Sequence, residues 1–191
     1  MKTVNIVGLS TDQREVSFMK GEKWGVNHGL FWDVGFDKVF VMDGLNGLTI
    51  VREKTISREG IIERINGLDF TLITPFLEKG VVRSEAYPLI QVKEKYDILY
   101  FKNTFSYMLA YAALHGFEDV HLHGVNMSDI IAYVWERPSV EHWIGVLRGQ
   151  GAKITSHDKE TRLFGGRPSF GGRTLYGYEM DEEKALKKVK K

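Results

Sequence analysis

The stretch from residue 103 to 128 constrains the fold most, because it holds a helix, a turn and a strand pattern in direct succession. Asn103 or Thr104 can cap a helix, since each offers a side-chain oxygen to the unpaired amides of a first turn. Apolar and small residues then recur at helical spacing. Gly116 follows where a left-handed residue commonly ends a helix. A capped helix and a tight turn are therefore predicted.

The same stretch continues as a buried strand that closes on small polar residues. Val120, Leu122 and Val125 supply the apolar positions, and Gly124 and Asn126 follow at its carboxyl end. In open α/β sheets, ligands bind outside the carboxyl ends of the strands. We therefore expect Gly124 and Asn126 to contact a ligand.

Strand and helix patterns alternate through the rest of the chain. Further strands are predicted over residues 2–9, 23–27, 37–42, 69–74 and 152–155, and helices over 12–20, 58–66, a short segment from 87, and 138–149. Residues 78–85 read as a small hairpin or loop. This alternation predicts a single-domain Rossmann-like α/β fold, with a doubly wound, mostly parallel sheet and helices on both faces. The domain is expected to span residues 1–179, followed by a basic tail over 180–191.

Composition excludes several classes of protein. The 191 residues include no cysteine, which rules out disulfides and thiolate metal sites and is typical of a cytoplasmic protein. No apolar run reaches the roughly 18 residues of a membrane span, so no membrane partner is expected. A net charge of +1 provides no general attraction for nucleic acid. The basic tail favours a solvated helix or a weak phosphate-binding arm.

Small and polar residues also follow the first three predicted strands. Gly8 and Ser10 lie in a turn whose amides suit a phosphate or simply the start of a helix. Asn27 offers a donor and an acceptor for a base or ribose, and an Asx turn is the equal alternative. Asp43 suits a ribose hydroxyl, a metal or an acceptor hydroxyl, or else it caps a turn.

A second polar cluster precedes the helix predicted at Pro138. Glu136 and Arg137 lie in the loop before this helix, and His142 lies in its first turns. A buried glutamate can act as a general base, and His142 is a neighbouring alternative. Arg137 can hold an anion with its guanidinium fork. The structural alternative is an Arg–Glu pair that helps to cap the helix.

Two other motifs carry weaker signals. His121 and His123 alternate with apolar residues, which is more typical of packing than of ligation, and no metal site is predicted. Residues 164–173 form a Gly-rich basic loop, either a surface loop or a mobile lid. This loop lacks the Lys-Ser/Thr ending of a P-loop.

Residues 103–128 resemble the nucleotide-sugar-binding half of the bacterial sialyltransferases that use CMP-sialic acid. In that family a Thr-Ser-Gly turn opens a YMxAxA helix, and a GYKEIYLxGxD strand follows. The chain is similar also to a phage protein family with a YFxxSFAYMLALAxxxGY…GVDM core. That pattern recurs here as WGVN (24–27), YPL (87–89), ERPSVEHW (136–143) and LYGYE (175–179). The resemblance covers residues 3–179.

The resemblance implies a glycosyltransferase-like enzyme that uses a nucleotide-activated donor as substrate and needs no separate cofactor. It implies a phage protein acting in the host cytoplasm, with modified DNA or a glycan as acceptor. The implied nucleotide-binding positions are Gly8, Ser10, Asn27, Asp43, Asn103, Thr104, Gly124 and Asn126. The family's catalytic histidine falls at Glu136, a departure that counts against sialyl transfer itself.

Two other functions remain open from the sequence. One is a non-catalytic nucleotide-binding module, such as a sponge or sensor, which needs the same contacts but no base. The other is a structural or assembly protein on a Rossmann-like scaffold, since a fold does not determine a function.

Overall fold

The protein is built around one seven-stranded parallel sheet. The computed structural model describes residues 1–48, 50–51, 54–127, 132–158, 161 and 163. The strands are β1 (Thr3–Val7), β2 (Glu22–Val26), β3 (Lys38–Phe40), β6 (Thr71–Thr74), β7 (Ser84–Ala86), β8 (Asp119–His123) and β9 (Lys153–Ser156). Their order is β7-β6-β3-β2-β1-β8-β9, and every pairing is parallel. A separate antiparallel pair joins β4 (Ile50–Val51) to β5 (Lys54–Thr55).

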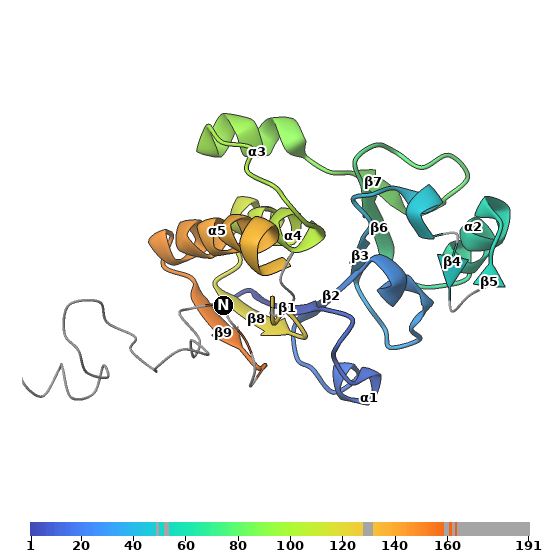
Figure 1. The fold of residues 1–191 in the computed structure, drawn as a ribbon, viewed down its shortest axis with the longest axis horizontal. Coiled ribbons are helices and arrows are strands. Elements are labelled where there is room, and N and C mark those ends of the chain that lie inside the picture. Colours follow the sequence, from blue (N-terminus) through green and yellow to red (C-terminus); the bar gives the residue numbers. More distant parts are fainter. Residues whose placement is uncertain (49, 52–53, 128–131, 159–160, 162, 164–191) are drawn as a thin grey trace, which may run out of the picture.

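Helices cover both faces of this sheet (Figure 1). The α-helices are α1 (Gln13–Val16), α2 (Arg58–Asn66), α3 (Leu89–Tyr96), α4 (Thr104–Leu114) and α5 (Arg137–Gly149). Two 3₁₀ turns, η1 (Asn27–Phe31) and η2 (Leu45–Leu48), follow β2 and β3. A π-helical turn, η3 (Ala132–Glu136), leads directly into α5.

The sheet separates two hydrophobic clusters. Val4 and Ile6 of β1 face the cluster that includes α4 and α5, whereas Val7 belongs to the cluster that includes Ile61 and Ile65 of α2. This alternation follows from the two-residue period of a strand. β1 is buried on both faces, and its apolar residues Val4, Ile6 and Val7 made it recognisable in the sequence, although the buried polar Asn5 interrupts the run.

The strand order creates one reversal of direction. From β1 the chain moves through β2, β3 and β6 to β7, and it then returns to add β8 and β9 on the other side of β1. Because α4 runs back across the sheet before β8, its first residue lies at the edge where the strands end. Ligands of doubly wound folds bind at this edge.

The predicted Rossmann-like α/β class is confirmed, and the predicted bounds of α2 match those observed. The hairpin or loop predicted over 78–85 is wrong in part, because Ser84–Ala86 forms a parallel edge strand beside β6. This strand lies outside the apolar core, so it has no hydrophobic pattern. The helix predicted over 12–20 is shorter, ending at Val16.

Part of the prediction lies outside the described residues. This applies to the Gly-rich loop at 164–173, the LYGYE segment and the basic tail over 180–191. Within the described part of the chain, no helix is long and apolar enough to cross a membrane.

Candidate functional site

The start of α4 is held by a reciprocal capping arrangement. The Asn103 Oδ1 accepts the Ser106 amide at 2.9 Å, and the Ser106 Oγ contacts the Asn103 amide at 3.5 Å. This is the capping box of helix N-termini, and it satisfies the third amide of the first turn. The amides of Thr104 and Phe105 precede the first intrahelical bond, so they are available to a ligand or to water.

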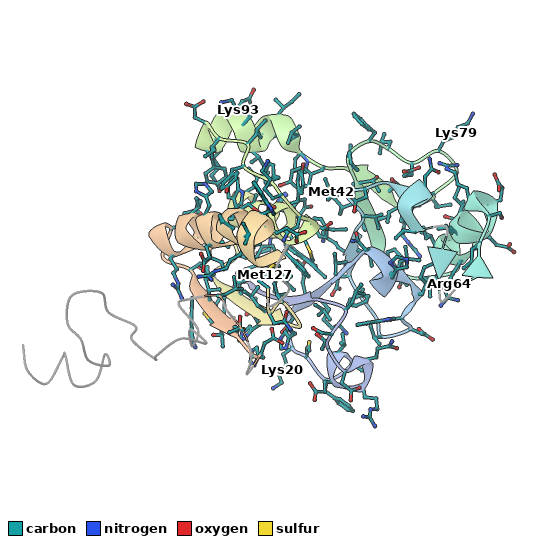
Figure 2. All side chains as sticks on the ribbon, in the orientation of Figure 1. Lys20, Met42, Arg64, Lys79, Lys93 and Met127 are labelled. Atoms are coloured by element: carbon teal, nitrogen blue, oxygen red, sulfur yellow. The ribbon has the colours of Figure 1, made fainter. Side chains whose placement is uncertain are left out.

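The capping bond also determines which side-chain atom of Asn103 faces the neighbouring residues. Because Oδ1 accepts from Ser106, the side-chain amide must direct Nδ2 the other way. Nδ2 donates to the Glu136 Oε2 at 3.0 Å and lies 3.7 Å from the Met127 Sδ. Glu136 therefore has one carboxylate oxygen engaged, and Oε1 has no hydrogen bond among the contacts described. Figure 2 shows Met127, in the loop that follows β8.

A cavity of about 520 Å³ opens at this helix start. It is lined by Val26, Asn27, Met42, Asp43, Phe101, Lys102, Asn103, Thr104, Phe105, Tyr107 and Glu136. The lining comes from the ends of β2 and β3, from the first turn of α4 and from the last residue of η3. Five of the predicted site residues are thus brought together: Asn27, Asp43, Asn103, Thr104 and Glu136.

Asn27 reaches the cavity through an unusual backbone conformation. Its φ is 46°, in the left-handed region that Asn tolerates better than most residues. The Thr104 Oγ1 donates to the Asn27 Oδ1 at 3.5 Å, which links the end of β2 to the start of α4. Met127, beside Asn103, has a φ of 51°. Strained residues of this kind cluster at functional sites, and these two flank the cavity's polar centre.

The apolar wall of the cavity is a set of stacked rings. Phe101 and Tyr107 are nearly parallel, with centroids 4.0 Å apart, and Phe101 stacks on the buried Trp143 of α5. Burial raises the pKa of Tyr107, and the nearby Asp43 carboxylate raises it further. Tyr107 therefore stays protonated at neutral pH as a hydroxyl donor close to Asp43.

The remaining predicted nucleotide-binding residues are not on the cavity wall. A Cβ added to Gly8 would lie 2.2 Å from the Gly124 carbonyl oxygen, so the loops after β1 and β8 are in direct contact. The Ser10 Oγ donates to the Gly124 carbonyl at 3.0 Å, which adds to that contact. Asn126 lies in the loop after β8, outside the lining.

An acidic residue already occupies the amides at the end of β8. Asp158, just after β9, accepts from the Gly124 amide at 2.8 Å and from the Val125 amide at 2.9 Å. A carboxylate bridging two adjacent amides uses the donors that a phosphate would use. The glycines at this crevice therefore allow the two loops to pack closely, whereas the cavity opens at the ends of β2 and β3.

Arg137 and His142 also lie off the cavity wall. The Arg137 Nε donates to the Glu141 Oε1 at 2.8 Å, one turn along α5, as in the structural alternative of an Arg–Glu pair. The His142 ring packs against Tyr100 and Trp143, and its buried Nε2 has no hydrogen-bond partner among the described residues. Of the three candidate catalytic residues, Glu136 is the one that reaches the cavity.

Sequence reasoning missed several residues of the cavity. Lys102 immediately precedes the cap, and no hydrogen bond or ion pair of its ammonium group is found within the described residues. Its position at the start of a helix is the signal that could have identified it. Phe101, Phe105 and Tyr107 were not identified, because their helical spacing is equally typical of core residues.

The histidines of β8 form a polar cluster on the face of the sheet that points away from α4 and α5. His123 and His157 are stacked with centroids 4.2 Å apart, and the His121 Nδ1 lies 2.9 Å from the His157 Nε2. Burial and the two neighbouring imidazoles lower the pKa of His123 to about 4. In the described part of the chain, no group of three or more potential ligands has the geometry for a metal ion.

No protein-family model matches the chain, and no curated protein matches its sequence. Solved structures do share its architecture. The sialyltransferase CstII from Campylobacter jejuni in complex with CMP-3FNeuAc has a TM-score of 0.54, 14% identity and coverage of 87% of this chain and 84% of that chain. CstII in complex with cytidine-5'-monophosphate has a TM-score of 0.53 and 13% identity, with the same coverage of both chains.

A second bacterial sialyltransferase shares the architecture to a similar degree. The monofunctional alpha-2,3-sialyltransferase Cst-I from Campylobacter jejuni has a TM-score of 0.53 and 12% identity, covering 100% of this chain and 92% of that chain. Likeness at this level of identity shows a shared Rossmann-like α/β fold. A shared fold does not determine a function, which depends on the residues of the site.

Proposed function

We propose that this protein is a glycosyltransferase-like enzyme that binds a nucleotide-activated donor in the cavity at the start of α4. The observation that carries the proposal is the Glu136 carboxylate, held by the Asn103 Nδ2 at 3.0 Å on the wall of a cavity of about 520 Å³. A carboxylate beside a helix N-terminus combines a base with a site for negative charge. The CMP and CMP-analogue complexes of the structural neighbours support the same donor class.

The donor's phosphate would lie at the positive end of α4. The amides of Thr104 and Phe105 and the ammonium group of Lys102 supply the donors there. Asn27 and Asp43 supply polar groups for a ribose or base, and Phe101 and Phe105 supply apolar contact area. These groups match the parts of a nucleotide: a charged phosphate, a hydroxylated sugar and a flat ring.

Glu136 would act as the general base of the transfer. Its Oε1 takes the proton of the acceptor hydroxyl while that oxygen forms a bond to the anomeric carbon of the donor sugar. The bond between the anomeric carbon and the phosphate oxygen breaks, and the nucleotide leaves with the electron pair. The α4 amides and Lys102 stabilise the negative charge that develops on the leaving group. The proton on Glu136 then returns to water.

A thermal-unfolding screen against CMP, CDP, UDP, GDP and their common sugar conjugates tests donor binding. A ligand at about 100 times its dissociation constant adds roughly 2.7 kcal/mol of stability. For a chain of this size, that corresponds to a rise in melting temperature of about 5 to 10 °C. Asn27→Ala and Thr104→Ala are expected to abolish the shift. Gln150→Ala, a change at the far end of α5, is expected to keep it.

The role of Glu136 is tested by nucleotide release from the donor with water as acceptor. Glu136→Gln is expected to lower the release rate at least about 100-fold, the usual contribution of a general base, while donor binding is kept. Glu141→Gln, in the first turns of α5 and off the cavity wall, is expected to leave the rate unchanged. Binding without any release in the unaltered protein would instead indicate a non-catalytic nucleotide-binding module. The absence of nucleotide affinity would favour an assembly protein.

A further inference from the structure

Among the described residues that line the cavity, acidic side chains outnumber basic ones. Asp43 and Glu136 are acidic, and Lys102 is the basic residue of the lining. The nearest arginine in sequence, Arg137, is bonded to Glu141 and does not line the cavity. The guanidinium fork is the side chain best suited to a carboxylate, and the described lining contains none.

The phosphate of a donor would use the positive charge that is present. Lys102 and the first amides of α4 adjoin each other at the helix start, and a phosphate bound there would neutralise them. The rest of the lining then carries the two carboxylates together with neutral polar and aromatic groups. Among the described residues of the lining, a further negative charge on the transferred sugar would have no positive partner.

The two carboxylates flank the helix start on different sides. Asp43 follows β3 and lies close enough to Tyr107 to raise its pKa, whereas Glu136 precedes α5 and bonds to Asn103. Both carboxylates line the same cavity, together with the first turn of α4. A donor sugar bound in a cavity of about 520 Å³ therefore lies in the field of both carboxylates.

Resting on the proposed function, we infer that the transferred group is a neutral or amino-bearing sugar, and that Asp43 and Glu136 exclude sugars that carry a carboxylate. Like charges that are brought together in a partly enclosed site cost enough to discriminate between ligands of equal size. A protonated amine on the sugar would gain the attraction that a carboxylate loses. The two acidic residues thus define the class of donor as well as supporting the chemistry.

A matched set of ligands tests this inference by calorimetry. UDP-glucose, UDP-glucuronate and UDP-glucosamine share a nucleotide and a ring, and they differ in the charge of one substituent. CMP and CMP-sialic acid provide the cytidine comparison. We expect the carboxylated donor to bind five- to tenfold more weakly than the neutral donor or the bare nucleotide, and the amino donor to bind at least as tightly. Raising the salt concentration should reduce these differences in affinity, because salt screens the exposed charges.

Charge-removing variants assign the selectivity to its residues. In the double variant Asp43→Asn/Glu136→Gln, the dissociation constants of the carboxylated and the neutral donor should differ by no more than about twofold. Glu141→Gln removes one negative charge from α5 outside the cavity and should leave the ratio intact. Tighter binding of the carboxylated donor, or a ratio unchanged in the double variant, overturns the inference while nucleotide binding still supports the proposed function. No binding of any nucleotide, bare or conjugated, overturns both.

Discussion

At the scale of single residues, Asn103 connects the stability of α4 to the geometry of the site. Its Oδ1 caps the helix through Ser106, and its Nδ2 orients Glu136. The two roles use different atoms of one amide, so substitutions can separate them. The orientation of Glu136 follows directly from the helix cap.

Asn103→Ala is expected to lower the free energy of unfolding by about 1 kcal/mol, because it removes the cap. Asn103→Ser keeps an oxygen that can accept from Ser106, so its stability should stay within about 0.5 kcal/mol of the original. Both variants lose the donor to Glu136, and both should release nucleotide from the donor more slowly. Urea unfolding and release assays on the same preparations measure the two effects. Equal destabilisation by Ser and Ala would mean that the cap contributes little.

At the scale of elements, the loops after β1 and β8 depend on the absence of side chains where they meet. Gly8 approaches the Gly124 carbonyl, and Gly124, with a φ of 65°, approaches Thr11. These glycines were predicted to contact a nucleotide, and in the structure they bring two chain segments together. The same residue type serves both purposes, since either a phosphate or a second backbone can occupy the space left by a missing Cβ.

Gly8→Ala is expected to destabilise the protein by about 2 kcal/mol or more, because the added methyl meets backbone that cannot move alone. Gly145→Ala is the matched control within α5, where an added Cβ meets nothing within 4 Å. It should raise stability by about 0.5 to 1 kcal/mol, since Ala is the better helix former. Thermal unfolding of the two variants should therefore give shifts of opposite sign. A small effect of Gly8→Ala would show that the two loops can separate.

At the scale of the whole molecule, three histidines, of which His123 is half-buried and His115 and His157 are largely exposed, couple folding to pH. Burial is the first cause of the lowered pKa of His115, His123 and His157. An unfolded chain protonates these side chains near pH 6.5, so it binds more protons than the folded chain below that value. Stability therefore falls as the pH decreases. For His123, whose pKa is about 4, the loss extends from pH 6.5 to about 4.

Unfolding in urea between pH 7 and 4 should show this loss, and His123→Gln should reduce it by about 1 to 2 kcal/mol after allowance for partial exposure. Glutamine can still donate to the Asn5 Oδ1, which His123 contacts at 3.2 Å, so the variant should fold. Asn5 is oriented by bonds to the Lys20 and Glu22 carbonyls, so its oxygen faces the ring. A pH profile of stability that is unchanged in His123→Gln would contradict the assignment of this loss to His123.

Much of the architecture was predictable from the chain alone. Alternating strand and helix patterns indicate a parallel sheet, because each pattern reports burial of local residues at a fixed period. The cap at Asn103, the turn at Gly116 and the bounds of α2 are local features of the same kind. The edge strand β7 was not predictable, since a strand outside the core needs no apolar pattern.

The site was predictable only in its individual members. Polar residues at strand ends and at a helix start were identified, because such positions are visible in the sequence as Asn27, Asp43, Asn103 and Thr104. The tertiary structure alone decided that these meet Glu136 around one cavity, whereas Gly8 and Gly124 close on each other. Strand order and helix placement set those distances, and they depend on contacts between residues far apart in the chain, which no local pattern records.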